Sequence, residues 1–111
     1  MKLNTLTKAM LLLSIGVFAG SDHFHPKKIA KCAKICTADE VKSALPEAIT
    51  YLNKWGKIDL VWAGAKVDSV EQKPFKKGPE WVLTLVNEKE VKRYVFVTLD
   101  GYVTGSNSTG N

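Results

Sequence analysis

Two runs of strand-forming residues near the carboxyl end restrict the fold most. Residues 80–87 and residues 93–99 are rich in Val, Leu, Thr and aromatic side chains, the types that favour β-strands. Asp100-Gly101 follows the second run, and this dipeptide favours the tight turn of a hairpin. Residues 102–104 would then pair back on the second run. The end of the chain therefore predicts an antiparallel sheet.

Residues 65–73 predict one more strand before these runs. Val67 and Val70 do not share a face at a period of two, so we expect a bulge between them. A loop with two prolines and a glycine, residues 74–79, joins this strand to the next. The sheet is thus expected to be a meander of three to four strands.

A helical pattern precedes the strands and can cover one face of the sheet. Thr37 and Glu40 form the capping-box pattern that begins a helix, and apolar residues recur at helical spacing over residues 41–55. Pro46 interrupts this pattern, because a proline inside a helix costs about 3 kcal/mol. We expect a helix over roughly 38–55 that is kinked or broken near Pro46. The predicted class is α+β, with this helix packed on the meander.

The first residues are typical of a signal peptide. Lys2 and Lys8 accompany an apolar run over residues 9–18, and the small residues around Ala19 and Ser21 suit cleavage. A membrane span needs about 20 residues, so we expect a periplasmic or secreted protein without a stable membrane anchor after cleavage. The predicted divisions are a signal peptide at 1–19, a mobile segment with His and Cys at 20–36, and a single α+β domain at 37–111.

Positive charge is spread along the chain and is densest over residues 27–34. The formal net charge of the sequence is +5, and it falls once the signal peptide leaves. Four lysines at helical spacing are typical of a solvated face, and attraction to an anionic membrane or an acidic partner is the alternative. No motif that reads a nucleic-acid groove is present, so we expect no nucleic-acid partner.

Cys32 and Cys36 are the first candidate site residues. In an oxidising compartment two cysteines indicate a disulfide. If Pro26 begins a short helix, their Cα atoms would lie about 6 Å apart, inside the range that a disulfide allows. Free thiols or an intermolecular bridge are alternatives. Thiol–disulfide exchange is the least unfavourable enzymatic reading, but the spacing is one residue longer than Cys-x-x-Cys.

A metal site is the second interpretation of this segment. His23, His25, Cys32 and Cys36 offer two imidazoles and two thiolates within a short stretch. This ligand set suits Cu(I) or Zn(II) as a bound metal cofactor. The spacing matches no zinc-finger pattern.

The sequence offers no set of catalytic residues. The serines lack the Gly-x-Ser-x-Gly context of a nucleophile, and no glycine-rich phosphate loop is present. Numerous aromatic residues form either the core with its rim or a groove for a ligand. We therefore predict a non-enzymatic binding module whose partner is a protein, or a peptide added along an exposed sheet edge.

Several stretches resemble one protein family. The most specific are Pro79-Glu-Trp-Val82, Tyr94-Val-Phe96 and Leu99-Asp-Gly-Tyr102, and residues 38–111 as a whole resemble the DUF6488 family. This resemblance implies a small exported bacterial protein of unknown function, with no catalytic residues to carry over. Just after the signal peptide, family members often have a histidine-rich stretch of the His-Gly-His type, and only His23 and His25 stand in that place here, so the resemblance gives a metal role little support. In architecture the chain is also similar to PepSY domains, and a shared fold implies no function.

Overall fold

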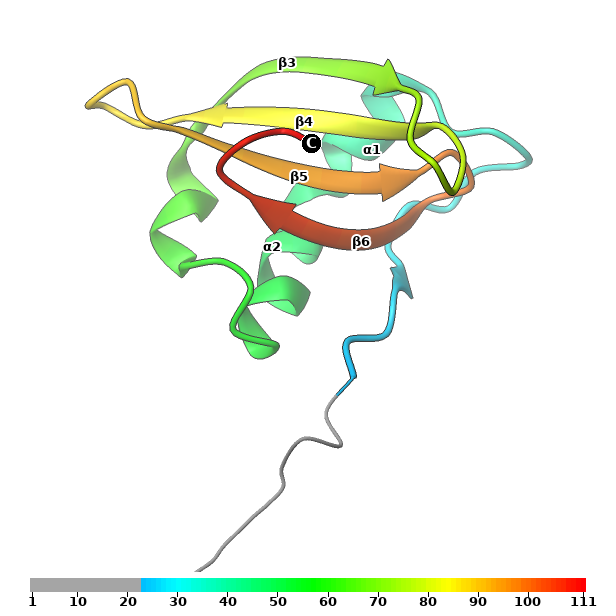
Figure 1. The fold of residues 1–111 in the computed structure, drawn as a ribbon, viewed down its shortest axis with the longest axis horizontal. Coiled ribbons are helices and arrows are strands. Elements are labelled where there is room, and N and C mark those ends of the chain that lie inside the picture. Colours follow the sequence, from blue (N-terminus) through cyan, green and yellow to red (C-terminus); the bar gives the residue numbers. More distant parts are fainter. Residues whose placement is uncertain (1–22) are drawn as a thin grey trace, which may run out of the picture.

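A computed structural model describes residues 23–111, in which two short helices lie behind a five-stranded antiparallel sheet (Figure 1). The predicted α+β class is confirmed. The predicted signal peptide, residues 1–19, lies outside the described residues. The elements are β2 (Lys27–Lys28), α1 (Ala38–Ser43), α2 (Leu45–Lys54), the 3-10 helix η2 (Leu60–Gly64), β3 (Lys66–Lys73), β4 (Glu80–Val86), β5 (Lys92–Thr98) and β6 (Tyr102–Asn107).

The strands lie in the order β2-β6-β5-β4-β3, and each neighbouring pair is antiparallel. The last four strands of the chain form the predicted meander. The register of β3 shifts between Val67 and Ser69, which confirms the predicted bulge. A second shift between β5 and β6 leaves Thr104 outside the regular pairing.

The fifth strand, β2, is the feature that the sequence analysis missed. Lys27 and Lys28 pair with Val103 and Tyr102 of β6, and the N–H groups of Ile29 and Ala30 then donate to the carbonyl of Gly101 at 2.9 and 3.2 Å. The short helix predicted from Pro26 is therefore wrong. A helix of about ten residues has little stability of its own, whereas the sheet edge satisfies these backbone groups directly.

Pro46 breaks the helical stretch, as predicted. The helix α1 ends at Ser43, and α2 begins at Leu45 with the proline in its first turn, where a missing N–H costs nothing. The capping box is also present, since the Thr37 hydroxyl accepts from the Glu40 N–H at 3.1 Å and the Glu40 carboxylate accepts from the Thr37 N–H at 2.8 Å. Local sequence rules thus placed the start of α1 and the break near Pro46.

The core lies between the helices and one face of the sheet. Side chains of α1 and α2 pack there against those of β4, β5 and β6. The fully buried members are Val41, Ala48, Ile49, Leu52, Leu83, Leu85, Val95, Val97 and Val103. Ile29, Ala30 and Cys36 belong to the same core, so the packed unit begins before residue 37, where we had expected the domain to start. The expected mobility of residues 20–36 stays a prediction.

The other face of the sheet is covered by short pieces of chain. Val82, Thr84 and Phe96 are buried there, and the ring of Phe75, from the β3–β4 loop, packs on Phe96 with centroids 5.7 Å apart. The carboxyl-terminal residues return across β5 (Figure 1), where Gly110 lies against the ring of Tyr94. None of the helices over residues 23–111 is long and apolar enough to cross a membrane.

Candidate functional site

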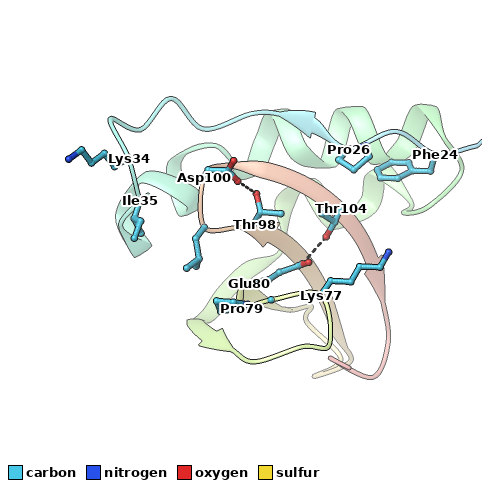
Figure 2. A pocket seen from close by; sticks show the side chains of 12 residues that line it. Phe24, Pro26, Lys34, Ile35, Lys77, Pro79, Glu80, Thr98, Asp100 and Thr104 are labelled. Carbon is cyan, nitrogen blue, oxygen red and sulfur yellow. Dashed lines mark hydrogen bonds between the residues drawn. The ribbon is translucent and has the colours of Figure 1, made fainter.

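A groove of about 660 Å³ opens at the end of the sheet where the β5–β6 turn meets the β3–β4 loop (Figure 2). The segment before α1 forms one wall and the β3–β4 loop forms the other, while the ends of β4, β5 and β6 line the space between them. The lining residues are Phe24, Pro26, Lys34, Ile35, Lys77, Gly78, Pro79, Glu80, Thr98, Leu99, Asp100 and Thr104.

Two threonines hold the carboxylates of this groove. The Thr104 hydroxyl donates to Glu80 Oε1 at 2.8 Å, and the Thr98 hydroxyl donates to Asp100 (Figure 2). Thr98 Oγ1 also accepts from the Tyr102 N–H at 2.9 Å, which ties the β5–β6 turn together. These hydrogen bonds fix the positions of both carboxylates, so the groove has a preorganised polar floor.

The free edge of β6 adjoins this groove. The strand β2 covers only Tyr102 and Val103, and over the described part of the chain no strand pairs with the outer side of residues 104–107. These four residues, Thr-Gly-Ser-Asn, carry no charge. The outward backbone groups of an edge strand can pair with another extended chain.

A proline and an aromatic cluster explain why β2 stops so early. An antiparallel extension would bring Pro26 and His25 alongside the uncovered residues of β6, but Pro26 has no N–H to donate. The chain turns towards α2 instead, where the His25 carbonyl accepts from the Tyr51 hydroxyl at 2.7 Å. The ring of Phe24 packs there on Tyr51 and Trp55, with centroids 5.8 and 5.6 Å away.

A second hollow, of about 380 Å³, continues the surface along β6. It shares Lys77, Glu80 and Thr104 with the groove. Beyond them it is lined by Phe75 and Phe96. The two hollows therefore lie along one path beside the uncovered residues of β6.

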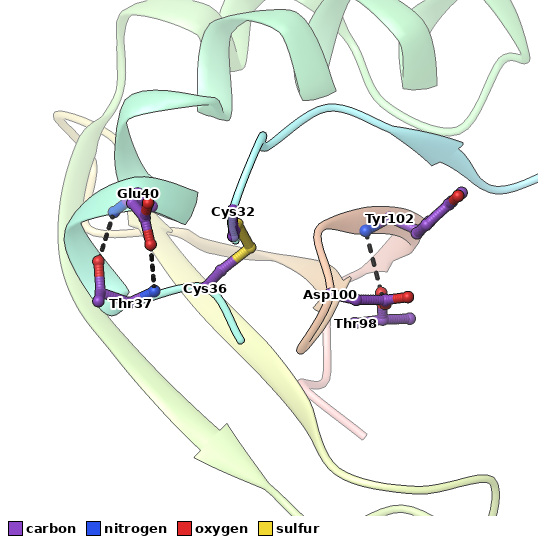
Figure 3. Close-up of a disulfide and its surroundings, with 7 residues drawn as sticks. All are labelled: Cys32, Cys36, Thr37, Glu40, Thr98, Asp100 and Tyr102. Atoms are coloured by element: carbon purple, nitrogen blue, oxygen red, sulfur yellow. Dashed lines mark hydrogen bonds between the residues drawn. A yellow bond between two sulfur atoms is a disulfide. The ribbon is translucent and has the colours of Figure 1, made fainter. Parts of the chain in front are cut away.

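The disulfide shapes the wall of the groove. Cys32 and Cys36 are bonded, with Cα atoms 5.0 Å apart (Figure 3), so the predicted disulfide is present in the structure. The Cys36 N–H donates to the Leu99 carbonyl at 2.8 Å, which fastens the loop to the β5–β6 turn. The tip of the loop presents Ile35, whose side chain is 63% exposed, to the groove.

The predicted metal ligands do not come together in this structure. Within residues 23–111 no group of three or more His, Cys, Asp or Glu side chains could hold a metal ion. The two cysteines are bonded to each other, the ring of His25 lies edge-on to Trp55 at 6.0 Å, and His23 is exposed. A thiolate ligand set would therefore need reduced cysteines and a different path for residues 23–36.

Sequence reasoning found the disulfide but missed the groove. Lys77, Thr98 and Thr104 lie in or beside turns whose residues the sequence explains by local structure alone. For the second hollow, Phe75 was an available signal, because a large apolar residue in a loop of Pro, Gly and Lys needs a place to pack.

A family model now accounts for the whole sequence. The model described as a family of unknown function, DUF6488, matches residues 1–111. The chain belongs to the DUF6488 family. The match extends the resemblance seen over residues 38–111 to the segment that carries the cysteines. No curated protein and no solved structure matches the chain, so the function of this DUF6488 protein is argued from its own geometry.

Proposed function

We propose that this DUF6488 protein is an exported, non-enzymatic binding domain that takes an extended segment of a partner protein along the free edge of β6. The observation that carries the proposal is that β2 pairs with β6 over only two residues. Residues 104–107 remain uncovered by a strand in the described structure and have hollows beside them. Main-chain pairing at such an edge supplies affinity, and adjacent pockets that take alternate side chains supply specificity.

The opposite edge of the sheet is less suited to a partner. The outer strand β3 carries charged residues at Lys66, Asp68, Glu71 and Lys73 and has the bulge near its start. Charges and bulges are the features that discourage pairing at an edge strand. The uncharged stretch of β6 has a bulge but no charge, so it is the edge that favours an incoming strand.

The edge of β6 is also held in place for binding. Arg93 donates from Nε to the Ser106 hydroxyl at 2.9 Å and from its guanidinium to the Lys57 carbonyl at 2.8 Å. The Asn107 side chain accepts from the N–H groups of Thr109 and Gly110 at 3.1 and 2.8 Å. A rigid edge loses little conformational entropy when a partner pairs with it.

The bonded state of the cysteines supports binding over thiol-based catalysis, because Cys32 and Cys36 are joined to each other. Export is consistent with this chemistry, because disulfides persist in oxidising compartments.

The test is selection of eight-residue peptides from a random library with the purified chain, followed by hydrogen exchange of the complex. We expect selected peptides to slow exchange at residues 104–107. Peptides that instead protect β3, or a library without any binder tighter than about 1 mM, would contradict the proposal.

A matched pair of glycine variants sharpens this test. A Cβ added at Gly105 or at Gly64 meets nothing within 4 Å, so both sites accept a side chain. Gly105→Leu places bulk in the hollow beside β6 and should weaken peptide binding about tenfold, whereas Gly64→Leu, in η2, should leave the affinity unchanged. Equal affinities for the two variants would place the bound peptide elsewhere.

A further inference from the structure

We propose that the segment bound along β6 is acidic, an inference that rests on the proposed function and specifies its partner. Charge is distributed unevenly along the described chain. Residues 23–36 and 73–77 hold seven lysines and no acidic residue, whereas the remaining described residues hold seven basic and ten acidic residues. The entire positive excess of the described chain is thus confined to two short segments.

These two segments face each other across the groove. Lys34 lies on the wall before α1, and Lys77 lies on the wall formed by the β3–β4 loop. Figure 2 shows the groove between these walls, with Thr104 of β6 beside Lys77. Lys76 and Lys77 also line the second hollow further along β6. A chain paired with residues 104–107 would therefore pass Lys76 and Lys77, and an end of it that continues into the groove would approach Lys34.

Most of these lysines are free to meet a partner. Lys27 pairs with Glu47 at 3.6 Å, and Lys28 lies over the ring of Tyr102 at 5.8 Å. Over residues 23–111, Lys34, Lys76 and Lys77 have no carboxylate within 4.0 Å. Exposed ammonium groups without a local counterion raise the local potential and attract negative charge.

The carboxylates of the groove reduce this potential but do not cancel it. Glu80 and Asp100 are the acidic residues that line the groove, and they offset two of the seven positive charges. Their hydrogen bonds from Thr104 and Thr98 hold them in place. We therefore expect acidic side chains of the partner to lie beside Lys34, Lys76 and Lys77 and away from Asp100.

The same charges disfavour a second copy of this chain as the occupant. A two-fold axis at the edge of β6 would place the lysine segments of one copy near those of the other. Like charges brought together at an interface are costly. An acidic extended peptide satisfies both the uncovered backbone and the lysines, so it is the occupant that the structure favours.

The experiment compares three labelled octapeptides that share alternating valines and differ only at the intervening positions, which carry Glu, Gln or Lys. We expect the Glu peptide to bind the full chain about tenfold more tightly than the Gln peptide, and the Lys peptide to bind most weakly. The advantage of Glu should shrink between about 0.05 and 0.5 M salt, because exposed charges are screened.

Charge-reversed variants locate the effect. Lys34→Glu with Lys77→Glu should remove the preference for Glu over Gln. Lys66→Glu with Lys89→Glu, an equal change at exposed sites near the β4–β5 turn at the other end of β4 from the groove, should keep it. All four side chains are exposed, so urea unfolding should show that both double variants fold. Loss of the preference in the control pair as well would mean that only net charge acts, which overturns the proposal.

The remaining outcomes separate the two proposals. Glu and Gln peptides that bind equally and both protect residues 104–107 would overturn the acidic partner and leave the binding domain. Absence of binding by all three peptides, together with a library without binders, would overturn both. Binding to vesicles of phosphatidylglycerol and phosphatidylcholine without binding to the Glu peptide would replace the acidic segment with an anionic membrane surface.

Discussion

The two edges of this sheet differ in what covers them. The edge at β3 has no neighbouring strand in the described chain, and it protects itself with charged side chains and a bulge. The edge at β6 pairs over two residues with β2, from the segment before α1. The uncovered residues 104–107 carry no charge. The edge at β3 resists pairing through its own side chains. The pairing of β2 with β6 depends instead on the contacts that hold the segment before α1 in place.

The contacts that hold β2 in place lie around the β5–β6 turn. The carbonyl of Gly101 accepts from Ile29 and Ala30, and the carbonyl of Leu99 accepts from Cys36. The disulfide closes the loop between these contacts. We therefore expect mutations around this turn to cost much more stability than mutations along β3.

Gly101→Ala should have the largest effect. Gly101 has a φ of +100°, and a Cβ there would overlap the Ala30 carbonyl and approach Cys36 Sγ. We expect a loss of about 3 kcal/mol or more in the free energy of unfolding, measured by urea titration. Gly105→Ala is the matched control, because its Cβ meets nothing within 4 Å, and it should change stability by less than about 1 kcal/mol. Equal losses would mean that the segment before α1 is not anchored at Gly101.

Removal of the disulfide should have the next largest effect. Cys32→Ala opens the loop without placing a polar group in the core, where Cys36 is buried. The chain-entropy model gives about 2 kcal/mol for a loop of this size. Addition of dithiothreitol should destabilise the wild type by a similar amount and leave the variant unchanged. A wild type indifferent to the reductant would show that the bond contributes no stability.

Thr98→Val should cost less, about 1 kcal/mol. The Thr98 hydroxyl donates to Asp100 and accepts from the Tyr102 N–H, and valine keeps the shape while both hydrogen bonds are lost. Thr98→Ser retains the hydroxyl and should restore most of the stability. If serine is no better than valine in urea unfolding, the hydrogen bonds of the turn are not the cause.

Ser69→Ala should have the smallest effect, about 0.5 kcal/mol or less. Ser69 lies beside the bulge of β3 and donates to the Thr84 hydroxyl at 3.1 Å, which is a part-buried contact at an edge strand. Thermal unfolding of this variant and of Thr98→Val under the same conditions gives the comparison directly. A larger loss at Ser69 than at Thr98 would reverse the ranking of the two edges.

Local signals predicted a large share of the fold. Four features could be predicted because each depends on residues within a few positions of one another. They are the strands of the meander, the turn at Asp100-Gly101, the break at Pro46 and the capping box at Thr37. The disulfide was readable for the same reason, since Cys32 and Cys36 are four residues apart. The helix predicted from Pro26 was wrong because these residues pair with β6 and with the carbonyl of Gly101, which are distant in the sequence.

Contacts between distant segments decided the rest. Lys27 and Lys28 carry no strand signal, and they form β2 only because β6 offers an uncovered edge. Phe75 of the β3–β4 loop packs on Phe96 of β5, and Lys34 and Lys77 line one groove although they lie far apart in the sequence.

The sequence by itself determined an α+β domain with a meander sheet, a broken helix and a paired set of cysteines, because periodicity, turn chemistry and spacing act over short range. Only the tertiary structure decided which edge of the sheet is left open and which charges surround it. The physical reason is that an edge is open or closed according to what the remainder of the chain brings beside it.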